Sequence, residues 1–218
     1  MKSIISKIKN KDEIFVFILM MIISIGITLN LKITAGDEIW NFQNIYKMYN
    51  GFKIYEDINV ITTPLFFICA KTIFHLFGAN LFIFRISHCI LMAILFLFTY
   101  KILKKLKITR TLSLLVILLI SVQNFFAIIR TGFNYNNLAI LITILGIYLL
   151  VQNKSKKTWF IQGILSILIF LIKQNIGVFY AMGYIIFVMM SKNLEKNKKI
   201  KEILKFVSVI ILSFIIFI

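Results

Sequence analysis

Long apolar runs with almost no charged side chains constrain this chain more than any other feature. They cover residues 14–31, 81–100, 111–129, 135–151, 158–172, 176–190 and 206–218. A helix that crosses the hydrocarbon core of a membrane needs about 20 apolar residues. Apolar residues make up 60% of the chain and charged residues 15%, which excludes a soluble globular enzyme and a disordered chain. The sequence therefore predicts an all-α, polytopic integral membrane protein.

The run 14–31 follows a basic N-terminal segment, MKSIISKIKNK. It is longer than the apolar part of a usual signal peptide, and no clear A-x-A cleavage site follows it. We interpret it as an uncleaved first helix.

The stretch 32–80 predicts an outer loop with two interfacial helices. Four apolar residues at spacings of 3, 4 and 3 share one helical face: Ile39, Phe42, Tyr46 and Tyr49. Asn50-Gly51 ends this amphipathic helix, because both residues tolerate a left-handed cap. The second segment, 64–77, would form about 21 Å of helix, which is short of the ~30 Å hydrocarbon core.

The basic residues set the orientation. If 64–77 does not span, 18 of the 25 Lys and Arg fall in 1–13, 101–110, 152–157 and 191–205, all on one side of the membrane. The positive-inside rule favours this arrangement, with seven spans and a cytoplasmic N-terminus. The net charge of +17 thus indicates cytoplasmic loops rather than nucleic-acid binding.

Residues 1–218 then form one transmembrane domain with a first helix, an outer loop (32–80) and six further helices (81–218). The last run stops at Ile218 without a polar tail, so we expect an N-terminal fragment of a larger protein.

The residues that could take part in a reaction fall on the outer side of the membrane in this topology. A carboxylate there can deprotonate an acceptor hydroxyl, and Arg or Lys can hold the phosphate of a leaving group. The topology puts these ionisable residues at the outer face: Asp37, Glu38, Glu56, Asp57, His75, Arg85, Arg130 and Lys173.

Three sequence segments carry a resemblance to a known family: GDEIW (36–40), NGFKIYEDINVITTPL (50–65) and FHLFGANLFIFRIS (74–87). They are similar to the start of the GT-C superfamily of membrane glycosyltransferases, in the branch of protein mannosyltransferases, lipid A aminoarabinose transferases and Rgt-like bacterial proteins. That family places Asp-Glu after the first helix, then a "G…Y.D…PPL" stretch, then "LFG…F..R". Thr63-Pro64 replaces the Pro-Pro pair of that pattern.

The resemblance implies a glycosyltransferase that moves a sugar, with inversion, from a polyprenyl-phosphate donor to a glycan, lipid or protein acceptor at the outer face of the cell membrane. Its catalytic candidates are Asp37 and Glu38, with Asp37 as base or as ligand of an acceptor or metal. The resemblance and the outer-side positions together give the following substrate-binding candidates: Asp57, Lys71, His75, Arg85, Arg130, Tyr135, Asn136 and Lys173. Whether a divalent metal ion takes part is left open.

Two other functions compete with this interpretation. A transporter or lipid flippase component would show paired halves with charges near the membrane midplane, and the chain has no internal repeat. A non-catalytic membrane scaffold would need no acidic cluster on one outer loop.

Overall fold

The computed structural model describes residues 2–29, 36–127, 132–152, 157–191 and 195–217. Over these residues the secondary structure consists of nine α-helices and one isolated β-bridge between Ile54 and Ile58. The prediction of an all-α fold is confirmed for this part of the chain.

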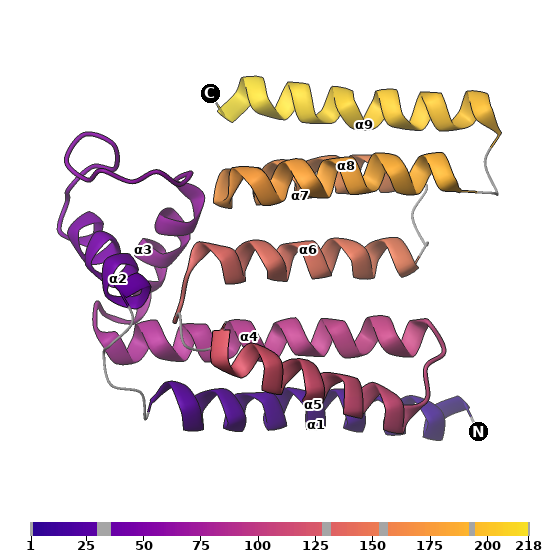
Figure 1. The fold of residues 1–218 in the computed structure, drawn as a ribbon, viewed down its shortest axis with the longest axis horizontal. Coiled ribbons are helices and arrows are strands. Elements are labelled where there is room, and N and C mark those ends of the chain that lie inside the picture. Colours follow the sequence, from indigo (N-terminus) through magenta and orange to yellow (C-terminus); the bar gives the residue numbers. More distant parts are fainter. Residues whose placement is uncertain (1, 30–35, 128–131, 153–156, 192–194, 218) are drawn as a thin grey trace.

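Seven long helices lie side by side along the long axis (Figure 1). They are α1 (Lys2–Thr28), α4 (Leu81–Lys105), α5 (Arg110–Ala127), α6 (Tyr135–Gln152), α7 (Thr158–Ile172), α8 (Gln174–Met190) and α9 (Lys196–Phe217). Helix α4 packs between α1 and α6, and α7 packs against α6, α8 and α9. By length and composition, α4 and α6 are long and apolar enough to cross a membrane, while α7 and α8 are shorter apolar helices. The number of seven spans stays a prediction.

The apolar runs predict most helix bodies closely, but α1 and α9 begin ten or more residues before their runs. Lys and Glu favour helix, so the hydrophobic pattern marks the apolar part of a helix and not its first residue. In α1 the polar turn is held by ion pairs. Glu13 lies 3.0 Å from Nζ of Lys101, and Asp12 lies 2.7 Å from Nη2 of Arg110.

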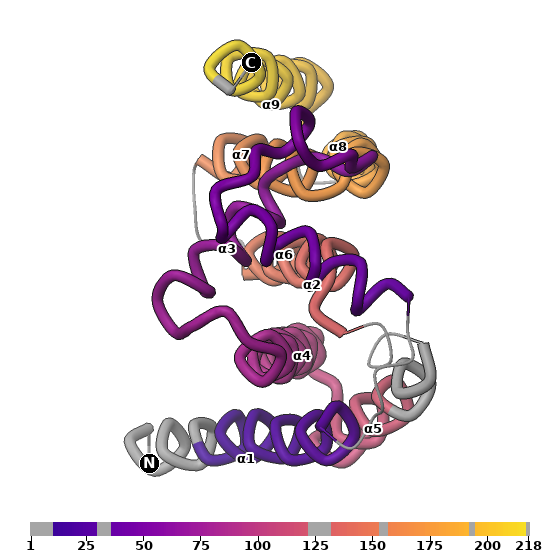
Figure 2. The backbone as a smooth tube through the Cα atoms, turned by 90° about the vertical axis from the view of Figure 1, so that its left-hand side faces the viewer, coloured from indigo at the N-terminus to yellow at the C-terminus, as the bar shows by residue number. Residues whose placement is uncertain are grey.

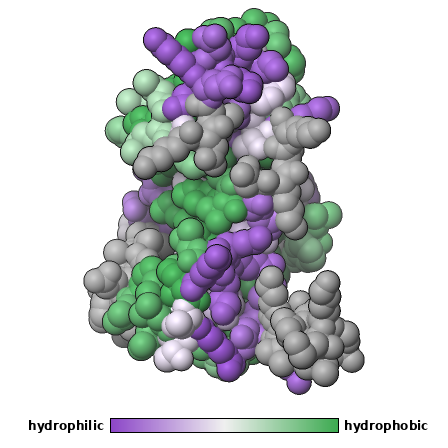
Figure 3. Space-filling model, turned by 90° about the vertical axis from the view of Figure 1, so that its right-hand side faces the viewer, coloured by the Kyte–Doolittle hydropathy of each residue, from purple (hydrophilic) through white to green (hydrophobic). Residues whose placement is uncertain are grey.

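The two ends of the bundle differ in character. One end gathers the N-terminus of α1, the C-terminal ends of α4, α6 and α8, and the N-terminal ends of α5, α7 and α9. We call it the basic end, because Lys104, Lys105 and Lys107 close α4 there. Viewed from this side, much of the described surface is hydrophilic (Figure 3). The prediction that the basic segments share one end thus agrees with the helix order, whereas its assignment to the cytoplasm stays a prediction.

Helices α2 (Gly36–Tyr49) and α3 (Leu65–Phe77) lie across the opposite end, which we call the α2–α3 end (Figure 2). Helix α2 stops before Gly51, whose φ of +98° only glycine adopts readily. Just before α3, Oγ1 of Thr63 donates a hydrogen bond of 3.0 Å to the carbonyl of Phe170, which ties the loop to the end of α7.

The face of α2 that packs against the rest of the protein begins one residue earlier than the apolar stripe predicted from sequence. The buried residues are Glu38, Asn41, Asn44, Ile45 and Met48. The predicted stripe lies beside this face. Phe42 contacts the rings of Phe74 and Phe84, while Tyr46 is 44% exposed. This rotation lets Glu38, a polar residue, reach into the bundle.

Candidate active site

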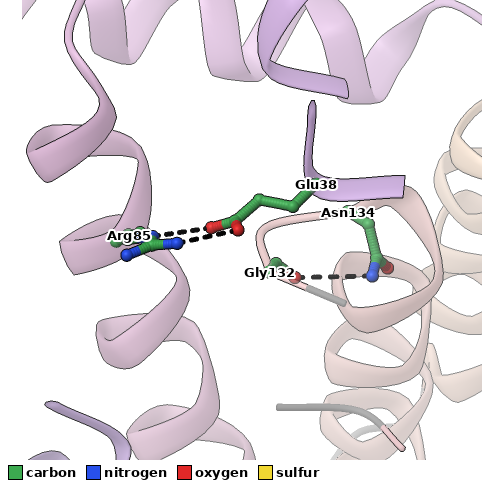
Figure 4. Close-up of polar contacts among 4 residues, drawn as sticks. All are labelled: Glu38, Arg85, Gly132 and Asn134. Carbon is green, nitrogen blue, oxygen red and sulfur yellow. Dashed lines mark hydrogen bonds and ion pairs between the residues drawn. The ribbon is translucent and has the colours of Figure 1, made fainter. Parts of the chain in front are cut away.

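A buried ion pair anchors the first turn of α2 to α4. Arg85 donates from Nε to Oε1 of Glu38 at 2.8 Å and from Nη2 to Oε2 at 2.9 Å (Figure 4). Both side chains are less than a tenth exposed. Two parallel charge-assisted hydrogen bonds fix the carboxylate in distance and in plane. Glu38 is therefore held in one orientation, and the backbone of its neighbour Asp37 is held with it.

Gly132 covers the other side of the Glu38 side chain. A Cβ at position 132 would lie 2.9 Å from Cγ of Glu38, so only glycine fits there without displacement. Its φ of +65° also favours glycine. The carbonyl of Gly132 accepts hydrogen bonds from the side-chain amides of Asn134, at 3.4 Å, and Asn137, at 3.2 Å. The start of α6 thus closes on Glu38 (Figure 4).

Asp37 has the opposite surroundings. Its side chain is exposed, although it stands next to buried Glu38 in the same helical turn. Its backbone carbonyl accepts a hydrogen bond of 2.8 Å from the side-chain amide of Asn41. The charge of its carboxylate is within electrostatic range of Tyr135 at the start of α6. Asp37 therefore presents an accessible carboxylate from a fixed backbone, which is what a general base requires.

A cation also lies close to Tyr135. Nζ of Lys173 lies 5.0 Å from the centre of the Tyr135 ring and donates a hydrogen bond to Oδ1 of Asn136. Lys173 separates α7 from α8, so this contact joins the end of α7 to the start of α6. The ring of Phe66 on α3 packs against Tyr135 at 6.0 Å. We refer to Asp37, Tyr135, Asn136 and Lys173 as the Asp37–Lys173 cluster.

The remaining predicted residues lie elsewhere or cannot be placed. Oδ2 of Asp57 accepts a hydrogen bond of 2.7 Å from the backbone of Lys53, which holds it within its own exposed loop. His75 packs against the ring of Tyr49 at 4.8 Å, and Lys71 is half-buried on α3. Among the contacts of the described residues, none links these three side chains to the Asp37–Lys173 cluster. Arg130 lies outside the described residues.

A metal ion is poorly matched by the described residues. No group of three or more His, Cys, Asp or Glu side chains gathers within the described ranges. Both oxygens of Glu38 are taken by Arg85, which leaves Asp37 as the exposed carboxylate at this end of α2. We therefore derive no step through a metal.

Gly132, Asn134 and Asn137 were not among the sequence candidates. Their signal was available, because a glycine followed by closely spaced asparagines at a helix start is typical of a turn with side-chain caps. The spacing does not reveal that the turn packs on Glu38, since the two segments are about 95 residues apart in the chain.

The comparisons with known proteins bear on this arrangement. Residues 62–218 match the family described as dolichyl-phosphate-mannose-protein mannosyltransferase. Neither the curated proteins nor the solved structures gave a match. The matched range includes Arg85, Tyr135, Asn136 and Lys173, whereas Asp37 and Glu38 precede it. It also extends the resemblance to the second half of the chain, where the sequence motifs were weaker. The match covers well over half of the chain, which therefore belongs to this family of membrane glycosyltransferases.

Proposed function

We propose that this chain transfers a sugar from a polyprenyl-phosphate donor to an acceptor at the outer face of the membrane, with Asp37 as the general base. The exposed Asp37 carboxylate lies within electrostatic range of Tyr135, and the Lys173 ammonium lies 5.0 Å from the centre of the Tyr135 ring. This juxtaposition of an acid and a cation is the observation that carries the proposal.

In the proposed transfer, the two charged residues of the cluster, Asp37 and Lys173, have different roles. The acceptor hydroxyl attacks the anomeric carbon of the sugar, the bond from that carbon to the phosphate oxygen breaks, and its electron pair goes to the phosphate. Asp37 takes the proton of the acceptor. Lys173 neutralises charge on the departing phosphate, with Asn136 holding its ammonium in place. Attack opposite the leaving group inverts the anomeric centre.

Glu38, Arg85 and Gly132 serve this site by position. Glu38 has no accessible lone pair comparable to that of Asp37, because it is 4% exposed and bonded to Arg85. The ion pair instead holds the α2 turn that carries Asp37. In this proposal Glu38 is a positioning residue. No contact in the described residues favours the transporter or scaffold interpretation over transfer.

The test compares Asp37→Asn with Glu56→Gln. Asparagine keeps the size of Asp37 but cannot accept a proton as a carboxylate does. Loss of a general base typically slows the reaction by about 10²–10⁴-fold. Glu56 is the matched acid, because its side chain is exposed and forms an ion pair with Lys53, three residues away in the same loop. The assay follows labelled mannose from polyprenyl-phosphate mannose into acceptors in membranes that contain equal amounts of each variant.

We expect Asp37→Asn to lose transfer and Glu56→Gln to retain it. Undiminished transfer by Asp37→Asn would remove the catalytic assignment. Loss of the Asp37→Asn protein from the membrane would instead assign Asp37 a role in folding.

A further inference from the structure

Lysines crowd the first part of α9, where the helix itself disfavours cations. The segment 195–205, EKNKKIKEILK, holds five lysines and two glutamates. No acidic residue lies in the first turn of α9. The N-terminal end of a helix carries a partial positive charge, which adds to the charge of the lysines. Hydrophilic surface gathers where α9 begins, at the top of Figure 3. This arrangement favours the binding of an anion.

Some of these lysines already have partners on the protein. Lys198 pairs with Glu195 at 3.3 Å, and Lys199 donates a hydrogen bond of 2.8 Å to a backbone carbonyl in the last turn of α8. Lys201 and Lys205 are exposed and lie four residues apart, which places them on the same side of α9. These two ammonium groups are therefore accessible to an anion outside the bundle.

A tryptophan marks the level of these two lysines along the bundle. Nζ of Lys205 lies 5.6 Å from the centre of the Trp159 ring, which belongs to the first turn of α7. The Trp159 ring also packs against the apolar cluster of Tyr184, Val188 and Phe206. Tryptophan is enriched where the headgroups of a membrane meet its hydrocarbon core. Lys205 therefore lies at the level expected for lipid headgroups.

Beyond Lys205, the same side of α9 becomes apolar. Leu204, Leu212 and Ile215 are all more than half exposed, and we call these side chains the aliphatic strip. The helical repeat places them on the side of α9 that carries Lys201 and Lys205. From Lys205 to Ile215 the helix rises about 15 Å, which is roughly half of the hydrocarbon core of a membrane. Cations followed by an apolar strip of this length match one phospholipid of a single leaflet.

We propose that Lys201, Lys205 and Trp159 bind the headgroup of an anionic phospholipid, whose acyl chain follows the aliphatic strip. Phosphatidylglycerol has the required chemistry, because its phosphate carries a negative charge that no cation of the same headgroup offsets. Phosphatidylcholine also carries a quaternary ammonium, which the lysines repel. This site lies at the basic end, far from the Asp37–Lys173 cluster, and does not depend on the proposed function.

The two tryptophans of the chain report separately on the two ends of the bundle, since Trp40 lies in α2 and Trp159 begins α7. Trp40→Phe leaves only the fluorescence of Trp159, and Trp159→Phe leaves only that of Trp40. Each full chain is placed in phosphatidylcholine nanodiscs in which a set fraction of the lipid is phosphatidylglycerol or phosphatidylcholine brominated on its acyl chains. Bromine quenches tryptophan at short range, and quenching is measured against the same lipid without bromine.

We expect brominated phosphatidylglycerol to quench Trp159 at a mole fraction about fivefold or more below that of brominated phosphatidylcholine. The reason is that each lysine near an anionic headgroup contributes roughly a factor of five in affinity. The preference should fall as salt is raised, because salt screens exposed charges. Trp40 should show no such preference.

Charge variants in the Trp40→Phe chain locate the site. Lys201→Gln combined with Lys205→Gln should bring the preference close to one. Lys201→Arg combined with Lys205→Arg keeps both charges and should retain it. Lys105→Gln combined with Lys107→Gln is the matched control, because it removes two exposed charges at the same end of the bundle but beside α4. This control should also retain the preference.

Four results would overturn the proposal. Equal quenching of Trp159 by the two brominated lipids would reject the site, and an equal preference at Trp40 would show general enrichment of phosphatidylglycerol around the protein. An equal loss in the Lys105→Gln, Lys107→Gln chain would assign the attraction to the whole basic end. Loss of the preference on adding inorganic phosphate at constant ionic strength would reject a lipid as the occupant. If the α9 glutamine variant fails to insert, the comparison of Trp159 with Trp40 decides.

Discussion

Adjacent residues at the start of α2 have opposite environments, and this contrast defines the candidate site. Asp37 is exposed, while Glu38 is buried between Arg85 and Gly132. Burying a charged pair is costly unless its hydrogen bonds are well made, and the Arg85 contacts satisfy both carboxylate oxygens. The ion pair thus fixes the turn of α2 that carries Asp37.

Removing only one member of the Glu38–Arg85 ion pair should lower the unfolding free energy strongly. In Arg85→Ala, Glu38 would stay buried without its partner, which typically costs about 3–5 kcal/mol of unfolding free energy. Glu38→Gln combined with Arg85→Gln removes both charges and should cost less than Arg85→Ala. Thermal unfolding in detergent, followed by tryptophan fluorescence, measures the order of the two variants. A double variant that is less stable than Arg85→Ala would contradict this account.

Two kinds of contact hold helix α2 against the α2–α3 end of the bundle. Its first turn contributes the ion pair, and its later turns contribute the apolar residues Ile45 and Met48. The aromatic residue Phe42 adds contacts to Phe74 and Phe84. The helix is therefore held along most of its length, and Asp37 does not depend on one interaction for its position.

This packing predicts different effects for neighbouring positions of α2. Ile45 is fully buried and Tyr46 is 44% exposed. Ile45→Ala should lower the unfolding free energy by about 2–5 kcal/mol, because a buried aliphatic side chain leaves a cavity. Tyr46→Ala should cost clearly less. The same unfolding assay compares them, and equal losses would show that the predicted stripe is packed as deeply as the observed face.

The whole molecule is a bundle with chemically distinct ends. Basic residues gather where α4 ends, and the acidic residues Asp37, Glu38, Glu56 and Asp57 lie at the opposite end. Helix α3 lies across the bundle at that end, so the chain returns to the same side before α4 begins. The Asp37–Lys173 cluster and the lysine-rich end are thereby separated by the length of the bundle.

The separation predicts the accessibility of single cysteines in intact cells. Asn59→Cys should react with an impermeant thiol reagent from outside, and Lys105→Cys should react only after permeabilisation, since both positions are exposed at opposite ends. The background carries Cys69→Ala and Cys89→Ala. Burial raises the pKa of the Cys69 thiol and slows its own reaction at neutral pH, so it adds little to the signal if retained. Labelling of Lys105→Cys from outside would show that the chain has the opposite orientation to the one predicted.

The apolar runs were enough to predict the helical class, most helix bodies and the two shorter helices between the first and the second long helix. These features depend on local composition, because a hydrocarbon environment requires apolar side chains and satisfied backbone hydrogen bonds over the length of each helix. The motif order also predicted the family, which the family match confirms, and it pointed to Asp37 as a candidate that stays a prediction.

Only the tertiary structure decided how the acidic residues differ. Nothing in the local sequence distinguishes Asp37 from Glu38, yet one is exposed and the other is buried against Arg85, 47 residues away. The contacts of Gly132 with Glu38 and of Lys173 with Asn136 also join distant segments. Such pairings depend on which helix faces meet when the bundle packs. Sequence periodicity defines the faces of each helix but not the partner that each face will find.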